Sequence, residues 1–445
     1  MSHILRRGML AVLLLLSSCL TALAVPGAAS AQGGTFDALT YNVAGLPEIL
    51  SSAATDRTTS HTAIGQRLGP YEIVNVQEDF NYHAALYAAD THPYRTATTG
   101  GAGIGSGLNT VSSYAFDELS RTKWADCALG SGDCLTPKGF TFLRVRLAEG
   151  VFVDVYNLHT DAGSESADIT ARAKNLAQVT SYIQTHSAGK AVIVMGDTNT
   201  RYTRTGDTIA AFAATNGLTD AWVQLERGGV PPVAGAAALL CDDAAPADSC
   251  ETVDKILYRG DGAVSLTATD YRNDSALFRE AGTGLMLSDH HPIATTFSWT
   301  TNPAVQQSDL YGGTGGTPFT DVPSLTAGAS PTTFTLRGGS RLDQAAVTLS
   351  GGITLAHGGT GGTAQSLTLG AGEHVASAKI CQGTYSGGVR VFSVTLTTSL
   401  GRTLTGGTAT SDCVTRTAPS GWRVAGFHGR AGSAVDRLGV VYTPR

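Results

Sequence analysis

The sequence predicts a layered α/β domain followed by a smaller all-β domain. Up to Trp299, runs with strand alternation are interleaved with one long helical period. After residue 308 the helical period is lost, and this last part holds 26 of the 54 glycines. Its Thr/Val/Leu-rich stretches predict strands joined by glycine turns. We therefore expect domains at residues 32–299 and 309–445, joined by a short polar linker at 300–308.

Residues 1–31 predict an export signal. Arg6 and Arg7 precede an apolar run that is too short to span a bilayer, and Ala29-Ser30-Ala31 forms a small-residue cleavage site. We therefore expect a secreted, extracellular protein. An alternative stays open, because Leu16-Ser17-Ser18-Cys19 also resembles a bacterial lipoprotein box, in which Cys19 would carry the lipid.

Six cysteines follow the signal region. An even number in an exported chain favours disulfides, since no Cys-x-x-Cys motif or histidine cluster accompanies them. They are Cys127, Cys134, Cys241, Cys250, Cys381 and Cys413. In chain order they fall into three natural pairs, two closing short loops and one spanning the C-terminal region, and their connectivity stays open.

In the first domain, the elements follow from residue periodicity. Alternation predicts strands at 37–43, 72–78, 140–147 and 151–157, and a continuous apolar run predicts a buried strand at 191–195. One helical face is formed by Ile169, Ala173, Leu176, Val179 and Ile183. The alternation of strands and helices predicts an α/β layered architecture.

The second domain repeats itself. Gly339–Asp343 and Gly432–Asp436 both have the pattern Gly-x-x-x-Asp before a strand, and Gly372–Ala376 is a third copy without the aspartate. The sequence Gly-Gly-Thr-Gly-Gly also occurs twice, at 312–316 and 358–362. Three related units predict a pseudo-threefold β architecture.

Composition and charge exclude two classes of protein. With 42% hydrophobic and 15% charged residues, the chain is too apolar to be disordered. Its formal charge is −6, which excludes a strongly basic nucleic-acid coat. Removing the +2 of residues 1–31 and the +4 of residues 309–445 leaves −12 for residues 32–308.

Short polar motifs end the apolar runs of the first domain. They are Tyr41-Asn42, Gln77-Glu78, Asn157-Leu158-His159, Gly196-Asp197-Thr198-Asn199 and Ser288-Asp289-His290-His291-Pro292, with Asp254-Lys255-Ile256 before the last. Polar groups at strand ends can meet at one edge of a layered sheet. Together they offer carboxylates and amides to a hard cation, plus histidines, as metal-assisted attack on a phosphate ester requires.

In this order the motifs resemble those of the endonuclease/exonuclease/phosphatase superfamily, which implies a four-layer, DNase-like α/β sandwich. The resemblance implies that Glu78, Asn42 and Asp289 hold Mg²⁺ or another divalent cation. It implies His290 as general base, Asp254 as the carboxylate that orients it, and His159 as a phosphate contact. Asp197 and Asn199 would position the attacking water and the phosphoryl oxygens. We expect His291 to be a wall of the site.

The segment Asp126–Gly139 resembles a Gly/Cys/Asp loop and Lys-Gly of bacterial secreted sphingomyelinases. This branch implies hydrolysis of sphingomyelin at a membrane surface, which yields ceramide and a phospho-headgroup. We expect the protein to be a monomer. One feature departs from the haemolytic members, which insert an aromatic hairpin into the bilayer. Residues 271–287 contain no tryptophan, so the membrane contact and the lipid stay open.

The C-terminal part resembles jacalin-type lectins, whose fold is an all-β prism. The resemblance implies a main sugar site at Gly432 and Asp436, a second at Gly339 and Asp343, and close approach of sugar to Gly315. Glycans are then expected partners. Two other functions stay open. The first is an extracellular deoxyribonuclease or phosphatase, and nucleic acid is an expected partner only for the deoxyribonuclease. The second is a lectin whose sandwich domain is inactive.

Overall fold

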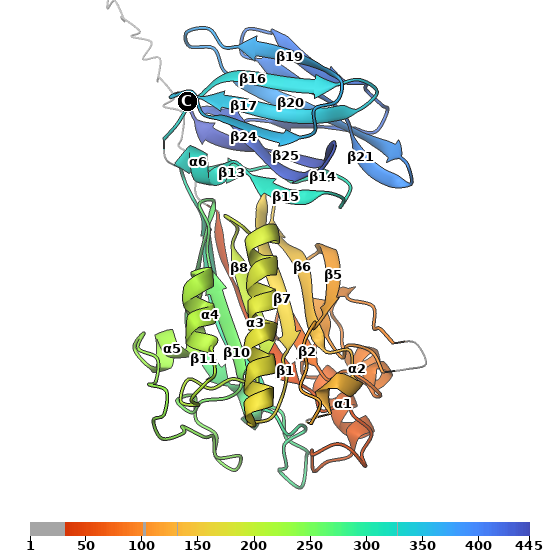
Figure 1. Cartoon of the computed structure of the whole chain (residues 1–445), viewed down its shortest axis with the longest axis vertical. Coiled ribbons are helices and arrows are strands. Elements are labelled where there is room, and N and C mark those ends of the chain that lie inside the picture. The colour runs from red at the N-terminus through yellow and green to blue at the C-terminus, as the bar shows by residue number, and fades with distance from the viewer. Residues whose placement is uncertain (1–31, 101–103, 131, 327) are drawn as a thin grey trace, which may run out of the picture.

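The computed structural model describes residues 32–100, 104–130, 132–326 and 328–445. The predicted signal peptide and Cys19 lie outside the described residues. Figure 1 shows two domains stacked end to end, an α/β domain below and an all-β domain above. Among the described residues, no helix has the length and apolarity needed to cross a bilayer.

The α/β domain is built on two six-stranded sheets. The first has the order β11-β12-β1-β2-β4-β3 and the second β5-β6-β7-β8-β10-β9. The strands of the first sheet are β1 (Gly33–Asn42), β2 (Ile73–Gln77), β3 (Tyr94–Arg95), β4 (Asn109–Ser112), β11 (Val264–Asn273) and β12 (Ile293–Thr301). Those of the second are β5 (Phe116–Lys123), β6 (Gly139–Ala148), β7 (Val151–His159), β8 (Val192–Asp197), β9 (Thr219–Asp220) and β10 (Asp254–Arg259).

Helices pack on both sheets, which makes four layers, and Figure 1 shows the front helical layer. Helices α1 (Arg57–Gly65) and α2 (His83–Ala89) pack on the first sheet. Helices α3 (Ser166–His186), α4 (Ile209–Asn216) and α5 (Ala221–Glu226) pack on the second. The four-layer sandwich expected from the sequence is therefore confirmed, as are the predicted strands and the long helix.

Buried amides join the two sheets at their centre. The Nε2 of Gln77 donates to Oδ1 of Asn157 at 2.8 Å, and Nδ2 of Asn157 donates to the carbonyl of Val76 at 2.9 Å. Because a buried amide must find partners, these contacts also fix how one sheet sits on the other. Gln77 and Asn157 are therefore the motif residues that hold the two sheets together.

Parallel pairing brings the motifs to one edge. Strands β1 and β2 are parallel, with Asn42 opposite Gln77, and β7 and β8 are parallel, with His159 opposite Asp197. At the other end of β7, Gly150 lies against the backbone of Gln307, where the all-β domain begins. The motif edge therefore faces away from the second domain.

The all-β domain has a four-stranded and a nine-stranded sheet. The first comprises β16 (Pro331–Gly338), β17 (Leu342–Leu349), β18 (Thr354–Gly358) and β19 (Thr363–Thr368). The second comprises β13 (Gln306–Gln307), β14 (Tyr311–Gly312), β15 (Thr317–Thr320), β20 (Val375–Tyr385), β21 (Gly388–Thr398), β22 (Thr403–Gly407), β23 (Cys413–Thr417), β24 (Trp422–Ala431) and β25 (Val435–Pro444), with the short helix α6 (Val322–Thr326) beside it.

The nine-stranded sheet consists of two parts that meet at one residue pair, Val375 opposite Val424, so three faces surround the core as in a prism. Strand β13 lies within the segment 300–308 that was expected as a linker, and it pairs with β25. Part of this segment therefore belongs to the nine-stranded sheet.

All three expected cysteine pairs are disulfides, at sequence separations of 7, 9 and 32 residues. The first two close loops next to the motif edge, and the third ties β20 to β23.

Candidate active site and sugar sites

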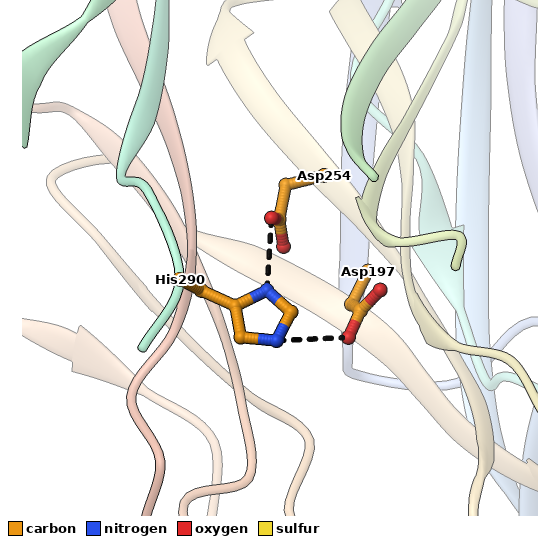
Figure 2. A group of neighbouring side chains, drawn as sticks. All are labelled: Asp197, Asp254 and His290. Carbon is orange, nitrogen blue, oxygen red and sulfur yellow. Dashed lines mark hydrogen bonds and ion pairs between the residues drawn. The ribbon is translucent and has the colours of Figure 1, made fainter. Parts of the chain in front are cut away.

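A histidine lies between two aspartates at the motif edge (Figure 2). The Nδ1 of His290 lies 2.9 Å from Oδ2 of Asp254, and its Nε2 lies 3.8 Å from Oδ2 of Asp197. Asp254 and Asp197 face each other across the antiparallel pair β8–β10. The Asp254 hydrogen bond keeps the proton on Nδ1, which leaves Nε2 as the atom that can accept one.

Asn42 links Glu78 to Asp197. Its Nδ2 lies 3.3 Å from Oε1 of Glu78 and 3.1 Å from Oδ2 of Asp197. Glu78 directly follows β2 and has a φ of 55°, which turns the chain at the strand end. The Nε2 of His159 lies 3.2 Å from Asp197 and 3.9 Å from Glu78. The structure thus brings six of the predicted residues into one cluster, namely Asn42, Glu78, His159, Asp197, Asp254 and His290.

The pKa values of the two histidines in the cluster are shifted in opposite directions. Burial lowers the pKa of His159 to about 3, and the positive charge of Lys138 acts in the same direction. Burial would also lower the pKa of His290, but the carboxylates of Asp254 and Asp197 raise it well above its usual value. His159 is therefore a neutral hydrogen-bonding group, whereas His290 is the more basic ring, and a cation beside Asp197 would offset the carboxylates and leave Nε2 able to accept a proton.

The remaining predicted residues lie around this cluster. Asn199 has a φ of 48°, and its backbone N–H donates to Oδ1 of Asp197 at 2.9 Å. Asp289 is exposed at the rim of a cleft that His290 also lines. The Nδ1 of His291 lies 2.8 Å from Oγ of Ser275, and its Nε2 lies 3.3 Å from Asp243. His291 therefore contacts groups outside the cluster.

Two further residues at the site were missed by the sequence reasoning. The ammonium of Lys138 is paired with the carboxylate of Asp133, and both side chains are almost fully buried. The field of Lys138 acts on Glu78, His159 and Asp197. The disulfide Cys127–Cys134 closes the loop that carries Asp133. Both residues lie in the segment Asp126–Gly139 whose resemblance was noted in the sequence, but that resemblance gave neither of them a role in the site.

The oxygen donors of the cluster fit a divalent cation. Asp197, Asp254 and His290 have ligand atoms within 4.8 Å of one another, and Asn42 connects Asp197 to Glu78. Oδ1 of Asp254 and Nδ1 of His159 are buried without a hydrogen-bond partner among the described residues. Burial raises the pKa of Glu78, which a nearby cation would counteract.

In the all-β domain, the predicted sugar residues also converge. A Cβ on Gly315 would lie 2.8 Å from Oδ1 of Asp436, so the glycine loop 312–316 presses on this carboxylate. A Cβ on Gly432 would lie 3.9 Å from Oδ2 of the same carboxylate. Arg390 forms an ion pair with Asp436.

The second predicted sugar site has the same construction. A Cβ on Gly361 would lie 3.0 Å from Cγ of Asp343, so the glycine loop 358–362 faces this aspartate. A Cβ on Gly339 would meet nothing within 4 Å, so this side of the loop is open. Arg341 lies 3.7 Å from Asp343.

Family models match both domains. The model of Endonuclease/Exonuclease/phosphatase family 2 matches residues 44–229, and that of the jacalin-like lectin domain matches residues 308–441. The chain carries an endonuclease/exonuclease/phosphatase domain and a jacalin-like domain. Of the cluster, Glu78, His159 and Asp197 lie within the first match, and the two Gly-x-x-x-Asp loops lie within the second.

Among curated proteins, the chain is 43% identical over 273 residues to proteins called sphingomyelinase from Mycobacterium bovis and Mycobacterium tuberculosis. The alignment covers 60% of this chain and 53% of each relative, so the chain spans about half the length of the curated relatives it matches.

Two solved structures are similar to one domain each. Sphingomyelinase C from Streptomyces griseocarneus matches 59% of this chain and 99% of its own, with 16% identity and a TM-score of 0.40. The wild-type Malaysian banana lectin matches 31% of this chain and 98% of its own, with 26% identity and a TM-score of 0.27.

Proposed function

We propose that this protein is a secreted, monomeric, magnesium-dependent phosphodiesterase of the sphingomyelinase type, which its jacalin-like domain tethers to glycan-bearing surfaces. The observation that carries the proposal is the cluster of His290 between Asp254 and Asp197, joined through Asn42 to Glu78. The 43% identity to the mycobacterial sphingomyelinases supports the choice of substrate class.

Each residue of the site has its own role in the proposed hydrolysis. Nε2 of His290 takes a proton from the attacking water, while Asp254 holds the ring and stabilises the imidazolium that forms. Neutral His159 and cationic Lys138 contact phosphoryl oxygens as charge develops there. Glu78 and Asp197, with Asp289 at the rim, would hold Mg²⁺ in this scheme, while Nδ2 of Asn42 donates to the first two carboxylates and its Oδ1 accepts from the N–H of Ala44. When bound, the cation supplies positive charge that offsets the charge of the phosphodiester.

Exposed apolar side chains around the cluster favour a lipid substrate over DNA. Ile49 and Leu50 are 92% and 66% exposed on the loop after β1, and Leu129 and Leu135 are 90% and 84% exposed beside the Cys127–Cys134 disulfide. Leu240 lines the cleft beside His290 and is 64% exposed. A bilayer can cover such a rim, whereas DNA would be drawn by basic residues.

The loops that carry several of these side chains extend below the sheets in Figure 1, at the end opposite the jacalin-like domain. The red-orange loop after β1 and the green loop after α5 both lie there. This arrangement would leave the jacalin-like domain free to hold a glycan while the catalytic end meets the lipid. Tethering raises the local substrate concentration without changing the active site.

The proposal is tested by incubating the purified protein with sphingomyelin vesicles and, separately, with plasmid DNA, each with Mg²⁺ or EDTA. Release of phosphocholine only with Mg²⁺, with the plasmid intact, is the expected result. A nicked plasmid with intact lipid would instead assign a nuclease. Failure to hydrolyse either substrate would leave a lectin with an inactive sandwich.

A further inference from the structure

The two Gly-x-x-x-Asp loops share a longer pattern, Arg-x-Gly-Ser-x-x-Asp, at residues 337–343 and 430–436. In each loop the arginine holds the facing glycine loop. Arg430 donates to two carbonyls of loop 312–316 at 3.0 and 2.8 Å. Arg337 donates to three carbonyls of loop 358–362 at 3.0 to 3.2 Å. The two sites are therefore matched in construction.

They differ in what holds the arginine. Arg430 also donates to Oε2 of Glu118, and Arg437, next to Asp436, donates to Oε1 of Glu118 at 3.0 Å. Glu118 belongs to β5 of the sandwich domain, not to the jacalin-like domain. In the part of the chain that the structure describes, Arg337 has no carboxylate partner. One sugar site is thus braced by the other domain, and its counterpart is not.

The backbone around Glu118 is shaped to present its carboxylate. The pairing of β5 with β6 shifts by one residue between Asp117 and Ser120, and Glu118 adopts a φ of 58° in this bulge. Its side chain is 1% exposed, and Arg144 of the same domain donates to its Oε1 at 3.1 Å. A left-handed conformation at a non-glycine residue persists only where the surroundings impose it, and such strain is often linked to function.

We propose that Glu118 is a positioning residue for the sugar site at Asp436. It fixes the guanidinium of Arg430, which in turn holds the glycine loop against Asp436. The affinity of this site for sugar therefore depends on docking of the sandwich domain, whereas the affinity of the Asp343 site does not. By linkage, sugar bound at Asp436 favours the docked arrangement of the two domains. The inference rests on sugar binding by the jacalin-like domain, which is part of the proposed function.

The test uses full-length chains with one sugar site each. Asp343→Ala leaves the Asp436 site, and Asp436→Ala leaves the Asp343 site. Glu118→Gln is introduced into both, and each protein is titrated with methyl α-mannoside, methyl α-glucoside and methyl α-galactoside by calorimetry. We expect Glu118→Gln to raise Kd at least tenfold at the Asp436 site and less than twofold at the Asp343 site. Because both sites lie in one domain, the second affinity reports whether that domain is folded.

Asp117→Asn is the matched control, since Asp117 lies on the same strand and pairs with Arg437 rather than with Arg430. It should change Kd at the Asp436 site less than Glu118→Gln does. Unchanged affinity at Asp436 in the Glu118→Gln chain would overturn the inference, and so would equal losses at both sites. If the unsubstituted chain binds none of the three sugars, sugar binding itself fails and the inference falls with it.

Discussion

Two adjacent histidines of the same motif face different surroundings. His290 is held at 2.9 Å by Asp254, whereas His291 contacts Ser275 and Asp243. We predict that His290→Ala lowers kcat by about 100- to 10,000-fold, the usual contribution of a general base. His291→Ala, the matched control, should lower it less than tenfold. Rates on vesicles would be compared for both variants, and similar losses would contradict the assignment of the base.

A buried lysine completes the charge distribution of the cluster. Because Lys138 is held by Asp133 and acts on three site residues, its ammonium should stabilise negative charge on phosphoryl oxygens. Lys138→Met is predicted to lower kcat/KM by about 100-fold or more, as loss of one electrostatic donor does.

Lys174→Met is the control for this change, because Lys174 forms an exposed pair with Asp126 near the same loop. Its kcat/KM should stay within twofold of the unsubstituted protein. Full activity of Lys138→Met would show that its field does not reach the reacting phosphate.

The sequence predicted the cluster better than its surroundings. His290, Asp254 and Asp197 stand at strand ends, where a motif has a fixed place in the sheet, and all three meet in the structure. Lys138 reaches the cluster only because a disulfide loop folds beside it, and loop geometry leaves no periodic pattern in a sequence. Glu118 faces a different domain, so its contacts could not be inferred from either domain alone.

At the scale of elements, the periodicity of the sequence predicted the strands and the long helix, but it did not predict where strand pairing is irregular. Of the predicted helical face, Leu176, Val179 and Ile183 are buried, whereas Ile169 and Ala173 are only half-buried. The bulge at Glu118 and the two-residue strand β13 were not predicted. A one-residue shift or a two-residue strand is too short to produce an alternation, and both are imposed by contacts with distant residues.

The apolar loop after β1 allows a prediction at the same scale. Replacing Ile49 and Leu50 by serine should lower the rate on sphingomyelin vesicles about tenfold or more relative to the rate on a water-soluble phosphodiester. The reason is that each large apolar side chain contributes roughly 1.5–3 kcal/mol when fully buried. Serine at Ile353 and Leu400 is the control, because both are exposed on the jacalin-like domain. An equal ratio in the two double variants would exclude a lipid contact by this loop.

At the scale of the whole molecule, charged groups of both domains pair across the boundary between them. Arg146 donates to both carboxylate oxygens of Asp309 at 2.9 and 2.8 Å. Arg430 and Arg437, which donate to Glu118, lie at the same boundary. His428 of β24 is buried at this boundary, with Nε2 lying 3.0 Å from the carbonyl of Ser308. The ring lies beside Phe152 of the sandwich domain. Stability of the assembled chain should therefore respond to pH through His428.

Burial lowers the pKa of His428 well below 6.5, and the charges of Lys190, Arg144 and Arg437 act in the same direction. In the unfolded chain this histidine takes up a proton near pH 6.5, whereas in the folded chain it stays neutral. Below that pH the unfolded state binds more protons, so stability is lost as the pH falls. Between pH 7.5 and 5.5 this single group should lower the free energy of unfolding by about 1.4 kcal/mol.

Urea unfolding at the two pH values, with and without His428→Gln, measures this contribution. Other titrating groups are common to both proteins, so the difference between their pH responses isolates His428. His374→Gln, at a half-buried position of the same domain, is the matched control. If His428→Gln responds to pH as the unsubstituted protein does, the imidazole takes up its proton in the folded state. The buried boundary would then have to admit water or an anion next to Lys190, contrary to the packing of the two domains.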